Sequence, residues 1–150
     1  MSMIPRLQDW TEQGIAHLDR LAPAADLLIR LCVANVFWKS GLTKIATWDS
    51  TLYLFEYEYA VPLLSPQAAA VVGTSIELAM PVLLVVGLAS RLSASILFIF
   101  NIAAVLSFPA ITFFSATDHQ YWGLMLLVTM FHGPGRFSID YYLKRALRRG

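Results

Sequence analysis

The chain alternates between long apolar runs and short polar breaks. Four apolar runs stand out, at residues 27–44, 67–88, 91–114 and 119–132. A transmembrane helix needs about 20 mostly apolar residues, so the second and third runs are long enough to cross a bilayer on length alone. The first run is interrupted by Arg30 and Lys39 and the fourth is short, so both need flanking residues or neighbouring helices to cross.

Each of these runs predicts a helix, because a segment in lipid must satisfy its own backbone hydrogen bonds. The break between the second and third runs is so short that it predicts an antiparallel hairpin of two helices. Residues 1–150 contain no internal repeat and no linker, so we expect a single domain. The pattern as a whole predicts an all-α fold, an integral membrane four-helix bundle.

Amphipathic segments flank the runs. An N-terminal interfacial helix is predicted from apolar residues that share one helical face: Leu7, Trp10, Ile15, Leu18 and Leu21. The aromatic-rich loop at residues 45–66 fits either helical or strand spacing, and we favour a short interfacial helix that anchors the loop or forms the rim of a site. A short basic C-terminal helix, capped by Ser138 or Asp140, would lie against anionic lipid.

Charge placement supports a membrane protein with both termini in the cytoplasm. The chain is 57% hydrophobic and only 14% charged, whereas soluble domains are nearer a quarter charged. Lys and Arg gather in the N-terminal segment, at Arg91 and in the tail, while the loop at 45–66 has none. We therefore expect the lipid bilayer as partner, not nucleic acid. The N-terminus lacks the features of a signal peptide, so we expect it to be retained.

Glu77 is the most informative single residue. It lies within the second apolar run, and Pro81 follows four residues later. A charge at the bilayer centre costs at least ~2.5–3.5 kcal/mol, so such an acid faces the bundle interior and usually marks function. Because Pro81 cannot donate a hydrogen bond to the Glu77 carbonyl, the helix backbone beside the carboxylate would be open. The alternative is a buried clasp that only fixes helix register.

Other polar residues are predicted at a similar depth, counted at about 1.5 Å per residue. Asn101 lies near the middle of the third run, and Lys39 near the middle of the first. On a helical wheel Arg30 and Lys44 share a face, and Lys39 lies opposite. We expect the Arg30 face to turn inward, with Arg30 holding the Glu77 carboxylate or a ligand oxygen.

The positions of the histidines and the single cysteine limit the metal and redox chemistry that we expect. His119, with Asp118 and Trp122, would gate the outer mouth of the bundle, or it is an ordinary interfacial histidine. His119 and His132 lie at opposite ends of the fourth run, too far apart to chelate one metal, so no metal site is predicted. Cys32 is the single cysteine, which excludes an internal disulfide and dithiol exchange within the chain.

Several of these features together resemble the DoxX family of small four-helix membrane proteins. They are Arg30, the stretch FWKSGLTK ending at Lys44, Glu77, the turn GLASR ending at Arg91, and the closing GPGRFSID. The resemblance extends over about residues 25–140. The stretch from Phe55 to Leu84 and the DHQYW before the fourth run resemble a bacterial subgroup whose members accompany peptide-modifying, metal-stress operons.

The resemblance implies a bacterial inner-membrane protein with a redox or assembly role. The family takes its name from a membrane subunit of a thiosulfate:quinone oxidoreductase, and other relatives act in redox homeostasis or as assembly partners. The sulfur-oxidation role does not carry over, because the sequence has no paired cysteines, no haem ligand pair at a plausible depth, and no flavin or iron–sulfur motif. The chain would be at most a subunit of a membrane oxidoreductase.

Our leading hypothesis is a redox accessory subunit with an intramembrane polar pocket for a quinone or similar lipid-soluble carrier. Glu77 would be the proton acceptor. The candidate ligand-binding residues are Arg30, Lys39, Lys44, Asn101, His119 and Trp122. One alternative is a non-enzymatic partner or assembly factor for membrane or peptide-modifying proteins, and another is a small transport or metal-stress component that would need to form an oligomer.

Overall fold

Helices make up most of the residues that the structure describes. The computed structural model describes residues 3–108 and 116–149, but not the side chains of residues 3–9 and 11. Within these ranges the elements are α1 (Met3–Ala46), α2 (Trp48–Tyr57), α3 (Pro66–Val86), α4 (Ser90–Ser107), α5 (Thr117–His132) and α6 (Ile139–Leu147). No strand occurs in the described residues, so the predicted all-α fold class is confirmed.

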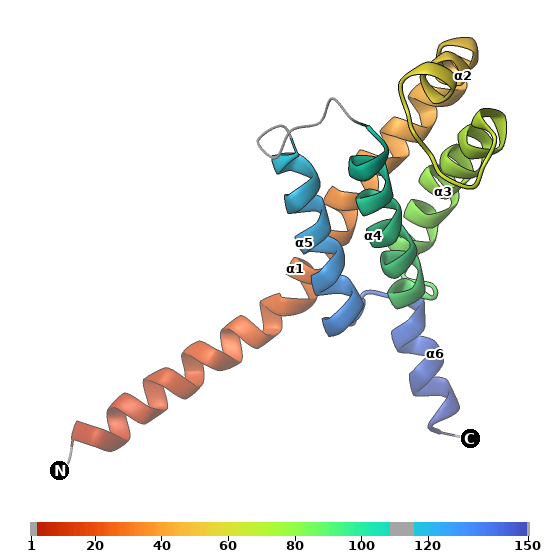
Figure 1. The fold of residues 1–150 in the computed structure, drawn as a ribbon. Helices are drawn as coiled ribbons and strands as arrows, with labels where there is room; N and C mark the ends of the chain where they lie inside the picture. The colour runs from red at the N-terminus through yellow and green to blue at the C-terminus, as the bar shows by residue number, and fades with distance from the viewer. Residues whose placement is uncertain (1–2, 109–115, 150) are drawn as a thin grey trace.

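Three helices are long and apolar enough to cross a membrane. They are the part of α1 over Glu12–Ala46, and the whole of α3 and α4. The shorter α5 packs against α4 and α1, and α3 packs against α1 and α4. Figure 1 shows these helices gathered into a bundle, with both chain termini at one end of it. We call this the termini end, and we call the opposite end, which carries α2, the far end.

The first helix is much longer than its apolar run. A separate N-terminal helix was expected before a span beginning near residue 27, but α1 runs without interruption for 44 residues and contains Pro23. Its N-terminal part projects from the bundle (Figure 1). Trp10, Ile15, Leu18 and Leu21 are exposed there, while the side chain of Leu7 lies outside the described residues. The apolar face predicted for this segment therefore has no partner within the described part of the chain.

The other predicted elements correspond closely to observed helices. The aromatic loop at 45–66 contains the helix α2 rather than a strand, as favoured from the sequence. The second and fourth runs correspond to α3 and α5. The third run was expected to reach residue 114, but α4 ends at Ser107 and residues 109–115 lie outside the described part of the chain.

Arg30 holds the termini end together. Its guanidinium is fully buried and donates to the carbonyls of Leu84 at 3.0 Å and Val85 at 3.2 Å. It also donates to the carbonyl of Phe137 in the segment before α6. The last carbonyls of a helix have no intrahelical partner and carry partial negative charge, so a buried cation is well placed at this end of α3.

The turn between α3 and α4 requires glycine at position 87. Gly87 has φ +76°, and a Cβ there would lie 2.5 Å from the Ser138 Cβ and 2.7 Å from Arg30 Nη1. Its carbonyl accepts from the Asp140 N–H at 2.9 Å. The Arg30 side chain and the start of α6 can approach the turn only because residue 87 has no side chain.

Asp140 caps α4, whereas Ser138 caps α6. The Asp140 carboxylate accepts from the N–H groups of Ala89 and Ser90, both at 2.8 Å, at the N-terminus of α4. Ser138 accepts from the Tyr141 N–H at 3.2 Å and so caps α6. Of the two caps weighed from the sequence, Ser138 is the one used on α6. Asp140 instead satisfies N–H groups on α4 that would otherwise have no partner.

Arg30→Gln is expected to destabilise the protein by about 3 kcal/mol, because buried carbonyls on α3 and before α6 lose a charged donor. Thermal unfolding in detergent, followed by circular dichroism, measures the effect. Lys39→Gln is the matched control, since Lys39 is an exposed cation on the same helix. An equal melting temperature for the two variants would contradict the role given to Arg30.

The hydrogen bonds that the Asp140 carboxylate accepts predict that the protein loses stability in acid. Burial raises the pKa of Asp140, but other interactions outweigh it and hold this pKa below its ordinary value of 3.8. These are hydrogen bonds from the backbone and side chain of Ser90, a hydrogen bond from the Ala89 N–H, and the positive charge of nearby Lys144. A carboxyl group whose pKa is lower in the folded than in the unfolded protein stabilises the fold at pH values above the unfolded-state pKa. This stabilisation is lost as the pH falls through the folded-state pKa. Melting temperatures of wild type and Asp140→Asn should therefore differ at neutral pH and converge below about pH 4. A constant difference across that range would contradict this.

Candidate functional site

Glu77 forms a buried ion pair with Lys44. The Lys44 Nζ lies 2.6 Å from Oε1 and 2.5 Å from Oε2 of Glu77. The two side chains are only 18% and 6% exposed. Ser40 completes the cluster, because its hydroxyl donates to Glu77 Oε1 at 3.1 Å and accepts from Lys44 Nζ at 3.0 Å. Both carboxylate oxygens and the ammonium group are therefore satisfied inside the protein, as burial of charge requires.

Local sequence explains how the lysine reaches the carboxylate. Ser40 and Lys44 are four residues apart on α1, so their side chains lie on one face of the helix. Gly41 lies between them, and a Cβ there would be 2.9 Å from the Leu78 side chain and 3.1 Å from the Glu77 Cβ. The missing side chain at 41 thus permits the close approach of α1 and α3 that brings Lys44 to Glu77.

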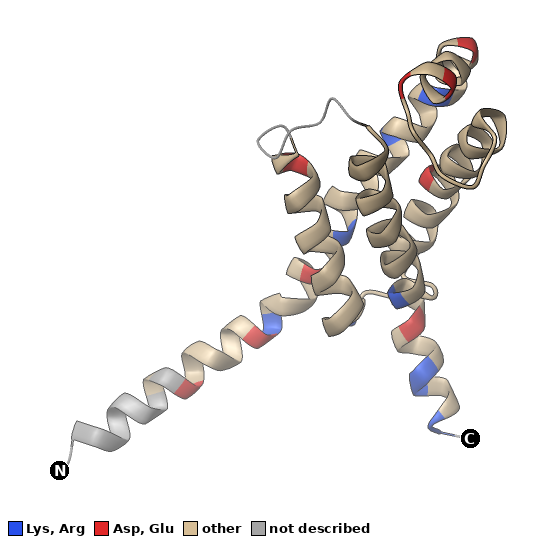
Figure 2. Cartoon of the chain, viewed as in Figure 1, with Lys and Arg blue, Asp and Glu red and all other residues tan. Residues whose placement is uncertain are grey.

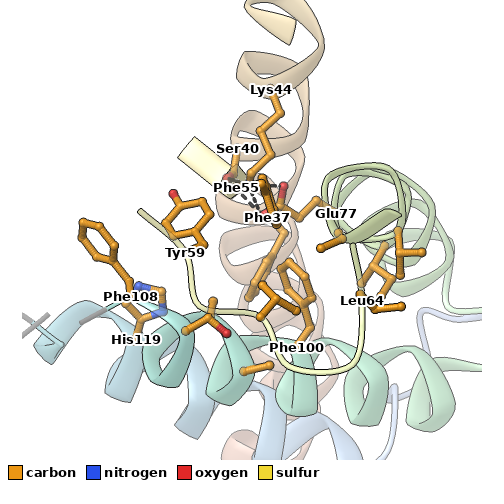
Figure 3. A pocket seen from close by; sticks show the side chains of 18 of the residues that line it. Phe37, Ser40, Lys44, Phe55, Tyr59, Leu64, Glu77, Phe100, Phe108 and His119 are labelled. Atoms are coloured by element: carbon orange, nitrogen blue, oxygen red, sulfur yellow. Dashed lines mark hydrogen bonds and ion pairs between the residues drawn. The ribbon is translucent and has the colours of Figure 1, made fainter. Parts of the chain in front are cut away.

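An aromatic cavity of about 400 Å³ lies beside this ion pair. Its wall includes Ser40, Lys44 and Glu77, shown in Figure 3. Most of the remaining wall is apolar, contributed by α1, α2, α3, α4 and α5 together with the loop after α2: Val36, Phe37, Phe55, Val61, Leu64, Ala69, Val72, Gly73, Ile76, Phe100, Ala103, Ala104, Phe108 and Trp122. A largely apolar cavity with a few polar groups is typical of a site for a small organic molecule.

The α2 helix and the loop after it cover one side of the cavity. The Thr51 hydroxyl donates to the carbonyl of Lys44 at 3.0 Å, which ties α2 to α1 beside the ion pair. The Tyr59 ring packs edge-on against Phe55 at 4.9 Å and Phe108 at 5.4 Å between ring centroids. The Ala60 N–H donates to the Ser107 carbonyl at 2.8 Å, so the loop is also tied to the end of α4. We call residues 48–65 the cover.

Tyr59 supplies a phenol to the cavity wall. Burial raises its pKa above the ordinary 10.0, and the negative charges of Glu77 and Glu58 raise it further. The phenol therefore stays protonated at neutral pH, so that it can both donate and accept a hydrogen bond.

His119 lines the cavity away from the ion pair, as Figure 3 shows. Asn101 fixes its ring: the Asn101 amide donates to the His119 carbonyl at 2.8 Å, which leaves Asn101 Oδ1 as the acceptor 2.8 Å from His119 Nδ1. Nδ1 must then carry a proton, and Nε2 is the nitrogen whose protonation changes when the ring becomes charged. Trp122 packs against this ring, with the centroids 4.7 Å apart.

The structure thus gathers some of the sequence-predicted site residues and separates others. Glu77, Lys44, His119 and Trp122 line one cavity, and Asn101 supports it from behind. The expected contact of Arg30 with the Glu77 carboxylate is corrected: Arg30 bonds backbone carbonyls at the termini end instead. Lys39 is exposed on α1 and does not line the cavity.

Sequence reasoning missed Ser40, and it included Tyr59 only within the aromatic-rich loop at residues 45–66. A signal for Ser40 was available, because it stands four residues before Lys44 with Gly41 between them. No comparable signal identified Tyr59, whose position depends on how the cover folds back over the bundle. Within the described residues, no group of three or more His, Cys, Asp or Glu side chains is arranged to hold a metal ion.

The ion pair predicts strong coupling between its two members. Lys44→Met should destabilise the protein by about 3–5 kcal/mol, because it leaves an uncompensated buried carboxylate. The double variant Lys44→Met/Glu77→Leu should recover most of this loss, because no charge remains buried. Unfolding in detergent for both single variants and the double variant completes the cycle. Additive losses in the double variant would contradict a desolvated pair.

Comparison with known proteins identifies a family. The family model described as DoxX matches residues 25–110 of the chain. This region contains Arg30, Ser40, Lys44, Glu77 and Asn101, and it ends before α5. No curated protein and no solved structure is detectably similar to the chain.

Proposed function

The chain belongs to the DoxX family, and we propose that it is an inner-membrane accessory subunit of a redox system that holds a quinone or similar lipid-soluble carrier. The observation that carries this proposal is the aromatic cavity with the Lys44–Glu77 pair in its wall. The apolar helices support a membrane protein. We further propose that α5 is the fourth span and that both termini are cytoplasmic, because the Lys and Arg residues of the α3–α4 turn and the tail lie at the termini end.

The chemistry of the wall suits a flat ring with polar atoms at its edge. The aromatic and aliphatic side chains would contact the faces of the ring. The Tyr59 phenol and His119 line the cavity and can hydrogen-bond to a carrier oxygen, and Lys44 can do so by exchanging its contact with Ser40. In this proposal it is Lys44, and not Arg30 as expected from the sequence, that holds the Glu77 carboxylate or a carrier oxygen.

Glu77 would accept or relay a proton for the bound carrier. Lys44 Nζ and Ser40 Oγ contact both the carboxylate and one another, so a proton arriving at Glu77 has neighbours that can stabilise either charge state. A quinone takes up protons when it is reduced, and the Glu77 carboxylate would first accept a proton and then pass it to the reduced carrier. Electrons would come from a partner protein, in keeping with an accessory role.

An assembly function is favoured by a different observation. The N-terminal part of α1 exposes Trp10, Ile15, Leu18 and Leu21, and this segment lies apart from the bundle (Figure 1). A partner membrane protein or a peptide-modifying protein bound there would make the chain a scaffold. In that case the polar cluster around Glu77 would serve only to fix helix register.

Extraction of bound molecules tests the carrier proposal. The protein is purified in native nanodiscs, and its small molecules are identified by mass spectrometry. Wild type should retain a quinone. Ala104→Phe should reduce the retained amount about tenfold by filling the cavity. Ile102→Phe is the matched control, because Ile102 is exposed on the same helix and does not line the cavity.

The same preparations separate binding from proton transfer. Glu77→Gln should keep much of the bound quinone yet lose function in a complemented deletion strain, since glutamine preserves shape and hydrogen bonding but not the charge. Full function of Glu77→Gln would refute the proton role. A wild type without quinone, or equal retention in Ala104→Phe and Ile102→Phe, would refute the carrier proposal and direct attention to a partner.

A further inference from the structure

A second cavity lies at the termini end. Its volume is about 410 Å³, and α1, the start of α4, the segment between α5 and α6, and α6 itself form its wall. Charged residues dominate this wall: Asp19, Asp26, Arg91, His132, Arg136, Asp140 and Lys144. It shares no residue with the aromatic cavity near Glu77.

The wall of this cavity carries charges of both signs. The acids Asp19 and Asp26 come from α1 and Asp140 from α6, and the cations Arg91, Arg136 and Lys144 come from α4, the α5–α6 segment and α6. Figure 2 shows acidic and basic residues on the inner part of α1 and on α6, and a basic residue at the start of α4.

Some of these charges already have partners inside the protein. Asp26 lies 3.1 Å from His132 Nδ1, Arg91 donates to the Phe131 carbonyl at 3.2 Å, and Asp140 caps α4. Asp19, Arg136 and Lys144 make no ion pair within 4.0 Å in the described part of the chain. One carboxylate and two cations in the wall are therefore available to a ligand that carries both signs of charge.

We propose that this cavity binds the headgroup of a phospholipid that carries both a phosphate and a primary ammonium group, such as phosphatidylethanolamine. The phosphate would lie against Arg136 and Lys144, and the ammonium group against Asp19. A purely anionic headgroup would leave Asp19 facing a negative charge. The distribution of charge thus selects a dipolar headgroup over an anionic one.

The surroundings identify a lipid rather than a soluble phosphate as the occupant. Leu21 and Phe131 stand next in sequence to the lining residues Ala22 and His132, and both are largely exposed. The start of α6 adds exposed Ile139, and Leu143 is exposed one turn later. Acyl chains attached to a headgroup in the cavity have these apolar surfaces to lie against. The inference rests on the chain being a membrane protein and not on the carrier proposed for the aromatic cavity.

Lipid retention from defined nanodiscs tests this site. The protein is reconstituted with equal amounts of phosphatidylethanolamine and phosphatidylglycerol, released into detergent, and analysed by native mass spectrometry. Wild type should retain phosphatidylethanolamine about tenfold more than phosphatidylglycerol. Arg136→Gln/Lys144→Gln should lower the retention of phosphatidylethanolamine about tenfold, because each basic residue near the surface contributes to phosphate binding.

Two further variants make the outcome specific. Arg148→Gln/Arg149→Gln removes the same charge from the same end of the chain but not from the cavity wall, so it should retain lipid as wild type does. Asp19→Asn should keep total lipid yet lose the preference for phosphatidylethanolamine. Equal losses in the two double variants, or no preference in wild type, would overturn the proposal whether or not a quinone occupies the other cavity.

Discussion

The arrangement of the bundle depends on one buried guanidinium. Arg30 reaches from α1 to the last carbonyls of α3 and to the segment before α6. Arg30 is fully buried near the carboxylates of Asp26 and Asp140, and its several directed N–H groups bond these carbonyls together. The tie also fixes where α3 ends, and therefore the turn from which α4 starts back along the bundle. The far end is left free for other chemistry.

The charged side chains are arranged differently at the two ends of the bundle. At the far end, a lysine and a glutamate neutralise one another within hydrogen-bonding distance, beside a wall of aromatic rings. At the termini end, Asp19, Arg136 and Lys144 line a cavity without forming ion pairs within the described residues. A closed pair favours a neutral apolar molecule next to it, because no net charge faces the cavity. Separated charges create a local field, and they favour a ligand with a dipole of its own.

The apolar runs of the sequence predicted the helices well because helices in lipid satisfy their own backbone. The helical wheel also placed the Arg30 face correctly inward, since Arg30, Phe37 and Gly41 are buried. Which cation pairs with Glu77 was harder to predict. Depth counting assumed that side chains leave a helix at the level of their Cα atoms, but long side chains lean toward the helix N-terminus, and Lys44 reaches back to the level of Ser40. The cover and the cavity beneath it depend on contacts between distant segments, which periodicity does not encode.

The cover gives the far end a kinetic property. A backbone hydrogen bond to α4 and packing of the Tyr59 ring hold its loop, and the bond from Thr51 to α1 holds α2. An opening of the cover would have to break these contacts. Opening of the cover, rather than the strength of the contacts inside the cavity, would then set the rate at which a bound molecule exchanges. A bundle of this kind could act as a slow reservoir, which keeps one molecule for longer than its affinity alone would suggest.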